Sequence, residues 1–363
     1  MKKNKNYVDL KDQPVPEGQH LFEVDDLKMY FHTEDGVVRA VDGVSYTLDR
    51  GETLGVVGES GSGKSVTAMT IMGLISMPPG KIEGGDVRYR GRSILEMTEE
   101  EMQHIRGNDI AMIFQDPMTS LNPVYKIGKQ VGEGLRLHRG YSKQEALKRA
   151  TELLDLVGIP EPEKRVNEYP HQFSGGMRQR VMIAMALACD PDILIADEPT
   201  TALDVTIQAQ IIELMQEMQE KNGNAIIMIT HDLGVVADMA DKIMVMYAGR
   251  PVEFGTAEEI FYESRHPYTW GLIRSIPEQA IEEKKPLTPI HGNPPSLMNL
   301  PEGCVFSPRC PYATDKCCKQ RPERVVTESG HYSACHYSGD PEFLKNAPET
   351  SRTRKDSKKG GEA

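Results

Sequence analysis

The sequence lacks the features that would place the protein within a membrane, outside the cell or on nucleic acid. None of its apolar runs approaches the roughly 20 residues needed to span a bilayer. No apolar stretch follows the N-terminal lysines, so the start of the chain does not resemble a secretory signal, and we expect a protein that stays in the cytoplasm. The formal net charge of −12 argues against general nucleic-acid binding.

Cysteine is scarce and unevenly placed. Five of the six cysteines lie between Cys304 and Cys335, and Cys189 stands alone in an apolar segment typical of a core helix. In a reducing cytosol such a cluster favours a metal over disulfides. The rest of the composition, 39% hydrophobic and 26% charged, is that of a globular protein with a sizeable core.

One stretch matches the phosphate-binding loop pattern G-x-x-x-x-G-K-[ST]. An apolar strand is predicted before it, at 53–57, and a helix after it, at 66–72. Backbone N–H groups and the helix N-terminus would hold phosphate, Lys64 would neutralise it, and the Ser65 hydroxyl would ligate Mg²⁺. The predicted ATP-binding residues are Gly58, Glu59, Ser60, Gly61, Ser62, Gly63, Lys64, Ser65 and Val66.

Several polar residues end predicted strands and complete a hydrolytic site. Asp197 closes the apolar run 193–196 and is expected in the Mg²⁺ shell, and Glu198 follows as the general base. Gln115 would reach both Mg²⁺ and the attacking water, and His231 would contact the γ-phosphate. A second predicted anion-binding helix start, Ser174-Gly175-Gly176, makes sense if it serves a partner's nucleotide.

Periodicity predicts an α/β protein. We expect edge strands at 21–24 and 27–31, a strand pair within 37–48, and buried strands at 110–114, 192–196 and 225–230. Helices are predicted at 98–105, with a capping box, at 142–156, with Leu147 on the buried face, and at 178–188. A hairpin is expected at 245–255, and no internal repeat suggests a second nucleotide cassette.

The ordered set of motifs closely resembles the ATP-binding cassette (ABC) family over about residues 21–265. The resemblance implies a P-loop, RecA-like core with an antiparallel β-subdomain and a helical subdomain at about 116–190. Two cassettes would sandwich two ATP molecules, and the signature Ser174-Gly175-Gly176 of each would complete the ATP site of the other. Asp204 would belong to the loop that follows Asp197 and Glu198, called the D-loop in that family. An aromatic residue usually stacks on adenine, and Phe31 or Tyr30 could serve.

One departure points to a branch of that family. Met177 stands where the signature commonly has Gln, and with Arg178-Gln179-Arg180 it resembles the ATPase subunits of bacterial oligopeptide and dipeptide importers. The segments 114–123 and 265–272 look like the same branch. The resemblance implies a peripheral subunit at the cytoplasmic face of the membrane. Its partners would be a paralogous ATPase, two permease subunits and an extracytoplasmic solute-binding protein.

The cysteine spacing is not that of a zinc ribbon, but four thiolates suit either Zn²⁺ or an iron–sulfur cluster. The surrounding residues are similar to the extension of peptide-importer ATPases, where a [4Fe-4S] cluster is held. By that resemblance the ligands are Cys304, Cys310, Cys317 and Cys335, with Cys318 as a spare. The domains expected are a flexible arm at 1–20, the cassette at 21–265, a Cys-rich extension at 266–340 and a disordered tail at 341–363.

The sequence therefore predicts an ATP-hydrolysing subunit that powers import of oligopeptides or dipeptides. An importer for nickel or another small solute is the alternative, because that branch shares many motifs. A soluble ABC ATPase of DNA repair or translation fits less well, because those proteins usually carry two cassettes or a basic surface.

Overall fold

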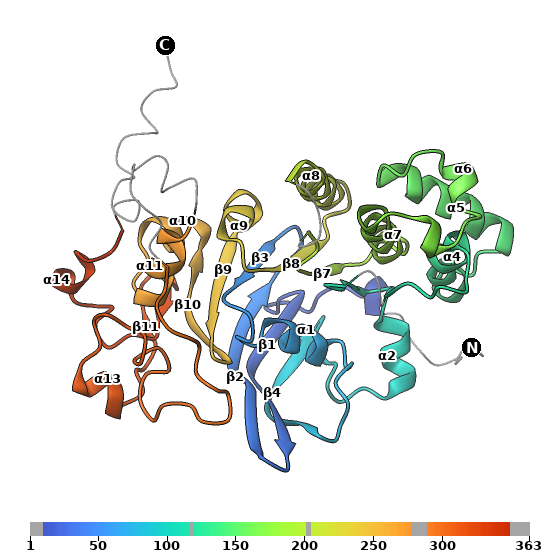
Figure 1. The fold of residues 1–363 in the computed structure, drawn as a ribbon. Coiled ribbons are helices and arrows are strands. Elements are labelled where there is room, and N and C mark those ends of the chain that lie inside the picture. The colour runs from blue at the N-terminus through green and yellow to red at the C-terminus, as the bar shows by residue number, and fades with distance from the viewer. Residues whose placement is uncertain (1–9, 117–119, 201–204, 277–288, 349–363) are drawn as a thin grey trace.

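A computed structural model of the chain describes residues 10–116, 120–200, 205–276 and 289–348. Its centre is a sheet in which five strands run parallel in the order β9-β3-β8-β7-β6 (Figure 1). Their bounds are β3 (Thr53–Val57), β6 (Ile110–Ile113), β7 (Ile193–Asp197), β8 (Ala225–Thr230) and β9 (Lys242–Tyr247). Their nearly continuous apolar sequences suit strands that are covered on both faces.

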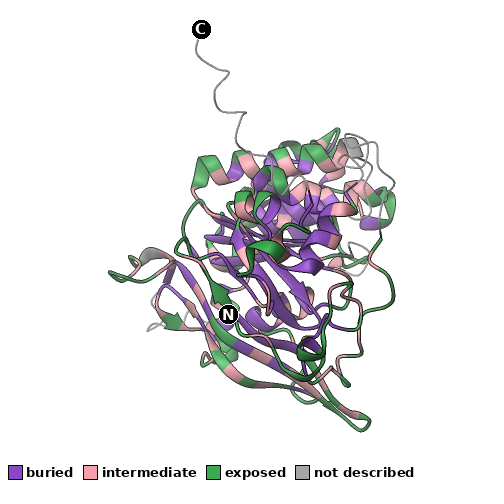
Figure 2. Ribbon diagram, turned by 90° about the vertical axis from the view of Figure 1, so that its left-hand side faces the viewer, coloured by how far each residue is buried: buried purple, intermediate pink, exposed green. Residues whose placement is uncertain are grey.

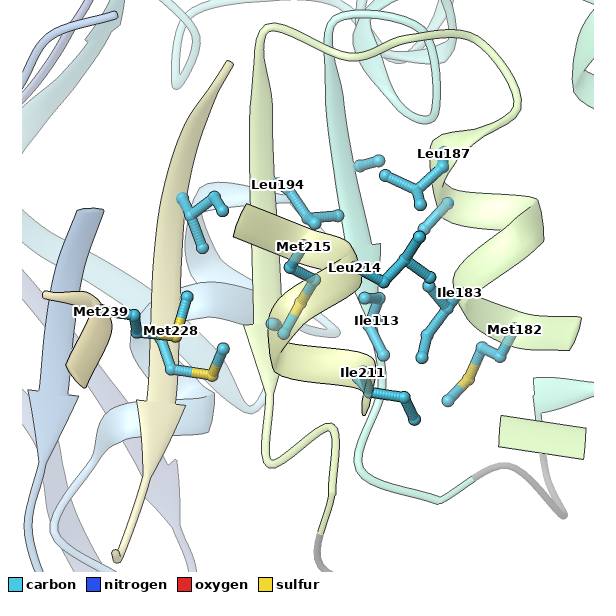
Figure 3. Packing of buried hydrophobic residues seen from close by; sticks show 14 of the residues in the cluster. Ile113, Met182, Ile183, Leu187, Leu194, Ile211, Leu214, Met215, Met228 and Met239 are labelled. Atoms are coloured by element: carbon cyan, nitrogen blue, oxygen red, sulfur yellow. The ribbon is translucent and has the colours of Figure 1, made fainter. Parts of the chain in front are cut away.

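Each face of this sheet packs against its own core. In β7, Leu194 and Ala196 belong to one cluster, and Ile193 and Ile195 to the other. The first cluster includes α7 (Gly175–Leu187), α8 (Val205–Asn222) and α9 (Leu233–Met239), whose packing Figure 3 shows in part. The second includes α1 (Lys64–Ile71), α2 (Glu99–Ile105) and an antiparallel sheet. The carboxyl ends of the parallel strands are thus held between two rigid layers.

The antiparallel sheet has the strand order β2-β1-β4-β5, with β1 (Phe22–Thr33), β2 (Gly36–Leu48), β4 (Gly80–Tyr89) and β5 (Arg92–Ser93). Buried and exposed residues mix along its strands (Figure 2). The prediction of two edge strands at 21–24 and 27–31 is wrong. Both segments belong to one strand, β1, which lies between β2 and β4. The expected pair within 37–48 is likewise the single strand β2. Asp26 has φ 44, and the pairing register shifts around Leu27, which is why β1 resembles two strands in the sequence.

The helical part of the cassette consists of α4 (Ile127–His138), α5 (Lys143–Leu156), α6 (Pro162–Arg165), the short 3₁₀ helix η2 (Pro170–Gln172) and α7. Ser142 caps α5, and the capping box expected for α2 at Thr98 is confirmed. The expectation that Leu147 is buried is wrong, because its side chain is 39% exposed. Helix α7 begins at Gly175 rather than 178, because the Ser174 hydroxyl accepts a hydrogen bond from the Met177 N–H and caps it.

The C-terminal region continues the central sheet. Strand β10 (Arg250–Thr256) pairs with β9, β12 (Tyr332–Ser333) pairs with β10, and β11 (Val325–Val326) pairs with β12, all antiparallel. The helices here are α10 (Ala257–Tyr262), α11 (Pro267–Arg274), α13 (Asp315–Lys319) and α14 (Pro341–Leu344). Tyr268 and Phe306 belong to the first core cluster, so this region shares its core with the cassette.

Both ends of the described chain are more ordered than the sequence suggested. Within the expected flexible arm, residues 10–12 form the 3₁₀ helix η1 (Leu10–Asp12), with Leu10 buried, and the Lys11 ammonium donates to the Cys189 carbonyl at 3.2 Å. Within the expected disordered tail, Phe343 of α14 packs its ring 5.3 Å from that of Trp270. Each segment is thus anchored to the rest of the protein by contacts with distant residues. Residues 1–9 and 349–363 lie outside the described part.

No helix within the described ranges is both long and apolar enough to cross a membrane.

Candidate active site

The phosphate loop lies between β3 and α1 and requires glycine at both ends. Gly58 has φ 152 and Gly63 has φ 99, conformations that L side chains rarely adopt. A Cβ on Gly58 would lie 2.2 Å from the Met246 carbonyl oxygen, and one on Gly63 would lie 2.2 Å from that of Ala40. The loop is therefore pressed against neighbouring backbone and aims the N-terminus of α1 at its centre.

Lys64 is the buried cation of this loop. Its ammonium donates to the carbonyl oxygens of Gly58 at 2.7 Å and Glu59 at 3.1 Å. Burial lowers the pKa of Lys64, while the carboxylates of Glu198, Asp197 and Glu59 oppose that shift. The lysine is thus held over the loop by carbonyls, in a place where phosphate oxygens would be better acceptors.

The carboxyl end of β7 meets the start of α1. The Ser65 hydroxyl donates to Asp197 at 3.0 Å, and Asp197 is 2% exposed. Burial raises the pKa of Asp197, and the neighbouring charge of Glu198 raises it further. A hydroxyl and a carboxylate joined in this way are suitable oxygen ligands for Mg²⁺.

Glu198 is the residue on which the polar groups converge. Its backbone has φ 46, rare for a non-glycine residue, and its N–H donates to the Ile229 carbonyl on β8 at 2.9 Å. Its carboxylate accepts from Gln115 Nε2 at 2.9 Å and lies 3.3 Å from His231 Nδ1. A strained backbone held by a neighbouring strand is typical of functional sites. The structure therefore joins residues from three strand ends around one carboxylate.

The two candidates for adenine stacking differ in their contacts. The Tyr30 hydroxyl donates to Asp42 at 3.0 Å, and Phe31 packs against the second core cluster. Stacking of either ring on adenine stays a prediction, and Asp204 lies outside the described residues.

The signature residues begin α7. Gly175 and Gly176 form its first turn after the Ser174 cap, and the Met177 side chain packs partly against the first core cluster. Further along α7, the buried Gln179 donates through Nε2 to the Pro199 carbonyl at 2.6 Å. The signature helix is thereby tied to the segment that follows Glu198. Gln179 belongs to a motif that the sequence singled out, but its contact with Pro199 was not predicted.

A second contact that sequence reasoning missed reaches the phosphate loop from the C-terminal region. The Glu59 carboxylate is bound by Arg309, and the Glu59 backbone N–H donates to the Tyr268 hydroxyl at 2.9 Å. Residues 59 and 309 are 250 positions apart, and no spacing rule connects them.

The predicted cysteine ligands come together, although not as a formed metal site. Among the described residues, no group of three or more His, Cys, Asp or Glu side chains is arranged to hold a metal ion. Four thiols nevertheless line one small cavity: Cys304, Cys310, Cys317 and Cys335. Burial raises the pKa of Cys310 to about 11 and that of Cys335 to about 12, so these thiols are protonated unless a cation compensates them. Cys318 is exposed and does not line the cavity.

A groove of about 750 Å³ lies among the helices of the cassette, with walls from α4, α5 and the segments preceding α4 and following α6. It carries four cations, Lys126, Lys129, Arg136 and Lys143. Val124 at its edge is 71% exposed.

The phosphate loop, the carboxylates at the end of β7 and the capped signature helix together define an ABC-type ATPase. Accordingly, the ABC transporter family matches residues 41–201, and the family described as "Oligopeptide/dipeptide transporter, C-terminal region" matches residues 252–317. The chain belongs to the ATP-binding subunits of oligopeptide and dipeptide transporters, ABC proteins that hydrolyse ATP to drive transport.

Individual relatives agree. The chain is 58% identical to the oligopeptide transport ATP-binding protein OppD of Bacillus subtilis, over 86% of this chain and 87% of the relative. It is 51% identical to the dipeptide transport ATP-binding protein DppD of Escherichia coli, over 88% of this chain and 97% of the relative. The dimeric ATP-binding cassette MJ0796, solved with ADP and Pi, has a TM-score of 0.59 at 29% identity, covering 65% of this chain and 98% of that one.

Proposed function

We propose that this chain powers import of oligopeptides or dipeptides by hydrolysing ATP with Glu198 as the general base. The observation that carries the proposal is the convergence of Gln115 and His231 on the Glu198 carboxylate, beside the Ser65–Asp197 pair. Only a group within hydrogen-bond reach of the attacking water can take its proton. Gln115 and His231 hold the two oxygens of that carboxylate in place.

ATP and Mg²⁺ fit the residues present. The glycine-lined loop leaves no room for a Cβ at Gly58 or Gly63, and Lys64 is buried against carbonyls. Lys64 would bind phosphate, while Ser65, Asp197 and Gln115 would hold Mg²⁺, which neutralises charge on the phosphates. With Mg²⁺ bound by Asp197 at the end of β7, the neighbouring Glu198 would remain free to accept a proton from the water.

The signature serves a second cassette in this proposal. The Ser174 cap leaves the first N–H groups of α7 directed outward, which suits a phosphate presented by a partner. The cassette MJ0796, which this chain resembles, was solved as a dimer. We infer that this chain pairs with a paralogous ATPase and that each chain completes the other's site.

The helical groove offers a place for the membrane partners. Its four cations and its exposed apolar edge suit an amphipathic, acidic segment. We infer that a cytoplasmic segment of one of the two permease subunits docks there, which would place the chain at the cytoplasmic face. An extracytoplasmic binding protein would deliver the peptide.

The cysteine cavity fits a [4Fe-4S] cluster in its chemistry. Four thiols line one cavity, and that of Cys317 comes from helix α13. Backbone hydrogen bonds from Phe306, Tyr312 and Tyr337 reach the other three thiols. Cys304, Cys310, Cys317 and Cys335 would hold the cluster, with Zn²⁺ as the alternative occupant, and its chemistry would be to cross-link the extension. Because the described thiols are not arranged as a metal site in this structure, they would have to move to ligate the cluster.

ATP turnover by the assembled transporter tests the central proposal. The isolated chain should turn over ATP slowly, and the complex with its partners quickly, because the site needs a facing signature. Equal rates for the isolated chain and the complex would refute the paired-site arrangement. Lys64→Ala should weaken ATP binding in both forms, and unchanged affinity in this variant would place the nucleotide elsewhere.

Anaerobic purification tests the cluster. We expect a brown protein with about four irons per chain. Cys310→Ser should lose the iron, whereas the matched control Cys318→Ser should keep it. Stoichiometric zinc without iron would instead identify the alternative occupant.

A further inference from the structure

The C-terminal region contacts the phosphate loop through one residue of the loop, Glu59. Arg309 forms a bidentate ion pair with the Glu59 carboxylate, with Nη1 at 2.5 Å from Oε2 and Nη2 at 2.9 Å from Oε1. The Arg309 side chain is 4% exposed and that of Glu59 is 30% exposed. Two parallel hydrogen bonds fix the orientation of both planar groups, which a single contact would not do.

The remaining donors of Arg309 are also used. Nε donates to the His291 carbonyl at 2.9 Å and Nη2 to the Ile290 carbonyl at 3.2 Å. The guanidinium lies 5.8 Å from the centre of the Tyr247 ring, a cation–π distance. Arg309 is therefore held in place by the fold, and Glu59 is its charged partner.

The backbone of Glu59 is held from the same side. Its N–H donates to the hydroxyl of Tyr268, a buried residue of α11. Tyr268 packs against Tyr247, with ring centres 4.6 Å apart, and against Phe306, at 5.4 Å. Phe306 also lines the cysteine cavity, and Arg309 directly precedes Cys310. Packed side chains thus run without a gap from that cavity to the phosphate loop.

We propose that Arg309 is a positioning residue for the phosphate loop, acting through Glu59, so that the C-terminal region sets the affinity for ATP. The inference rests on the proposed ATP site. The Lys64 ammonium donates to the Glu59 carbonyl, so the orientation of Glu59 also fixes the lysine. A loop already ordered by Arg309 loses less conformational entropy when ATP binds.

Charge gives Arg309 a second effect. An unpaired carboxylate in the phosphate loop would repel the triphosphate, and the guanidinium cancels that charge. Removing Arg309 should therefore loosen the loop and expose a negative charge, whereas removing the Glu59 charge as well should relieve the second penalty.

Nucleotide binding to the full-length chain tests the proposal. We expect Arg309→Met to raise the Kd for ATP about tenfold, which corresponds to about 1.4 kcal/mol. Glu59→Gln should raise it less, and the double variant should bind better than Arg309→Met alone. Arg309→Lys, which keeps the charge but not the bidentate geometry, should fall between wild type and Arg309→Met. In the assembled transporter, KM for ATP should rise while kcat stays within about twofold.

Two controls separate this role from general damage. Arg324 lies in the same region, stacks on Tyr332 and contacts Gly43 instead of the phosphate loop, so Arg324→Met should leave ATP affinity unchanged. Thermal unfolding shows whether Arg309→Met is folded. If it is not, Glu59→Ala removes the same ion pair from the cassette side.

The outcomes are distinct. If Arg309→Met binds ATP as wild type does while Lys64→Ala does not, the proposed function stands and this inference fails. An effect of Arg309→Met that is the same in the wild-type chain and in the Glu59→Gln variant would also refute it, because Arg309 would not be acting through Glu59. Failure of the wild type to bind ATP would refute the proposed function itself.

Discussion

The aspartates at the two ends of strand β7 have their pKa values shifted in opposite directions. Asp192, just before the strand, is 4% exposed and accepts hydrogen bonds from Tyr89 at 2.6 Å, from Arg90 and from Arg50 at 2.9 Å. Burial alone would raise the pKa of Asp192, but the hydrogen bonds from Tyr89 and Arg90 hold it below its usual value. Asp197, at the other end, has its pKa raised by burial.

The two aspartates differ in the number of positively charged side chains that bind them. Two arginines neutralise Asp192 within the fold, and this end of the strand fastens the antiparallel sheet to the core. The other end gathers Asp197 and Glu198 around Lys64, whose ammonium donates to backbone carbonyls. A surplus of buried negative charge is costly unless a bound cation compensates it. The same residue type therefore pairs with arginines of the fold at one end and, in the proposed function, ligates Mg²⁺ at the other.

The largest expected effect is on turnover at the functional end. Glu198→Gln keeps the shape but cannot accept a proton, so ATP turnover of the complex should fall by about 10² to 10⁴. ATP binding should persist, and thermal stability should be unchanged or slightly higher, because one negative charge beside the buried Asp197 is gone. Normal turnover in this variant would show that Glu198 is not the general base and that neither end of β7 is catalytic.

The second effect is on stability at the structural end. Asp192→Asn leaves Arg90 buried without its carboxylate, which should cost about 3 kcal/mol of unfolding free energy. Urea unfolding measures this loss. The folded fraction should hydrolyse ATP at the wild-type rate, and a turnover defect as large as that of Glu198→Gln would show that the two ends are not independent.

A smaller, pH-dependent effect follows from the lowered pKa of Asp192. Its folded pKa lies below its unfolded value, so its contribution is present above about pH 4 and is lost as the pH falls through the folded value. The difference in unfolding free energy between wild type and Asp192→Asn should therefore shrink on acidification. A difference that grows toward low pH would mean that the folded pKa is raised.

The smallest effect is expected in the signature helix that contacts the functional end. Met177 packs partly against the core, and α7 reaches β7 through Gln179 instead. Glu198→Gln in this chain would silence its own ATP site, so that only the partner's site, which the signature of this chain completes, turns over. In that complex, Met177→Gln should change the hydrolysis rate by less than about threefold. Gln179→Ala is the informative comparison, because it removes the contact with Pro199. A large effect of Met177→Gln would show that its side chain reaches the partner's nucleotide.

Much of the functional end could be predicted from the sequence, because its residues follow strands whose apolar runs are unmistakable. Asp197, Glu198, Gln115 and His231 each end such a run, and parallel strands bring their carboxyl ends to one edge. The apolar runs predicted an α/β protein, whereas the P-loop fold of an ABC ATPase was implied by the family resemblance and is confirmed by the ABC family match.

Features that depend on long-range pairing could not be predicted. The break at Asp26 hid the continuity of β1, and a two-residue strand such as β12 has no periodicity to detect. Arg309 contacts Glu59, 250 positions away, and Gln179 contacts Pro199, and no spacing rule predicts either contact. The proposed roles of the site residues and the boundaries of the domains remain predictions.

The antiparallel attachment of β12 to β10 has a consequence for how the protein is made. Until the ribosome has synthesised Tyr332, the outer edge of β10 has unpaired backbone groups, and Phe254 lacks the Tyr332 ring that stacks on it at 5.6 Å. Exposed strand edges with aromatic side chains recruit other chains. A chain that ends before Tyr332, even after the last ATPase motif, would therefore carry an unpaired edge and should aggregate more readily than the full-length chain.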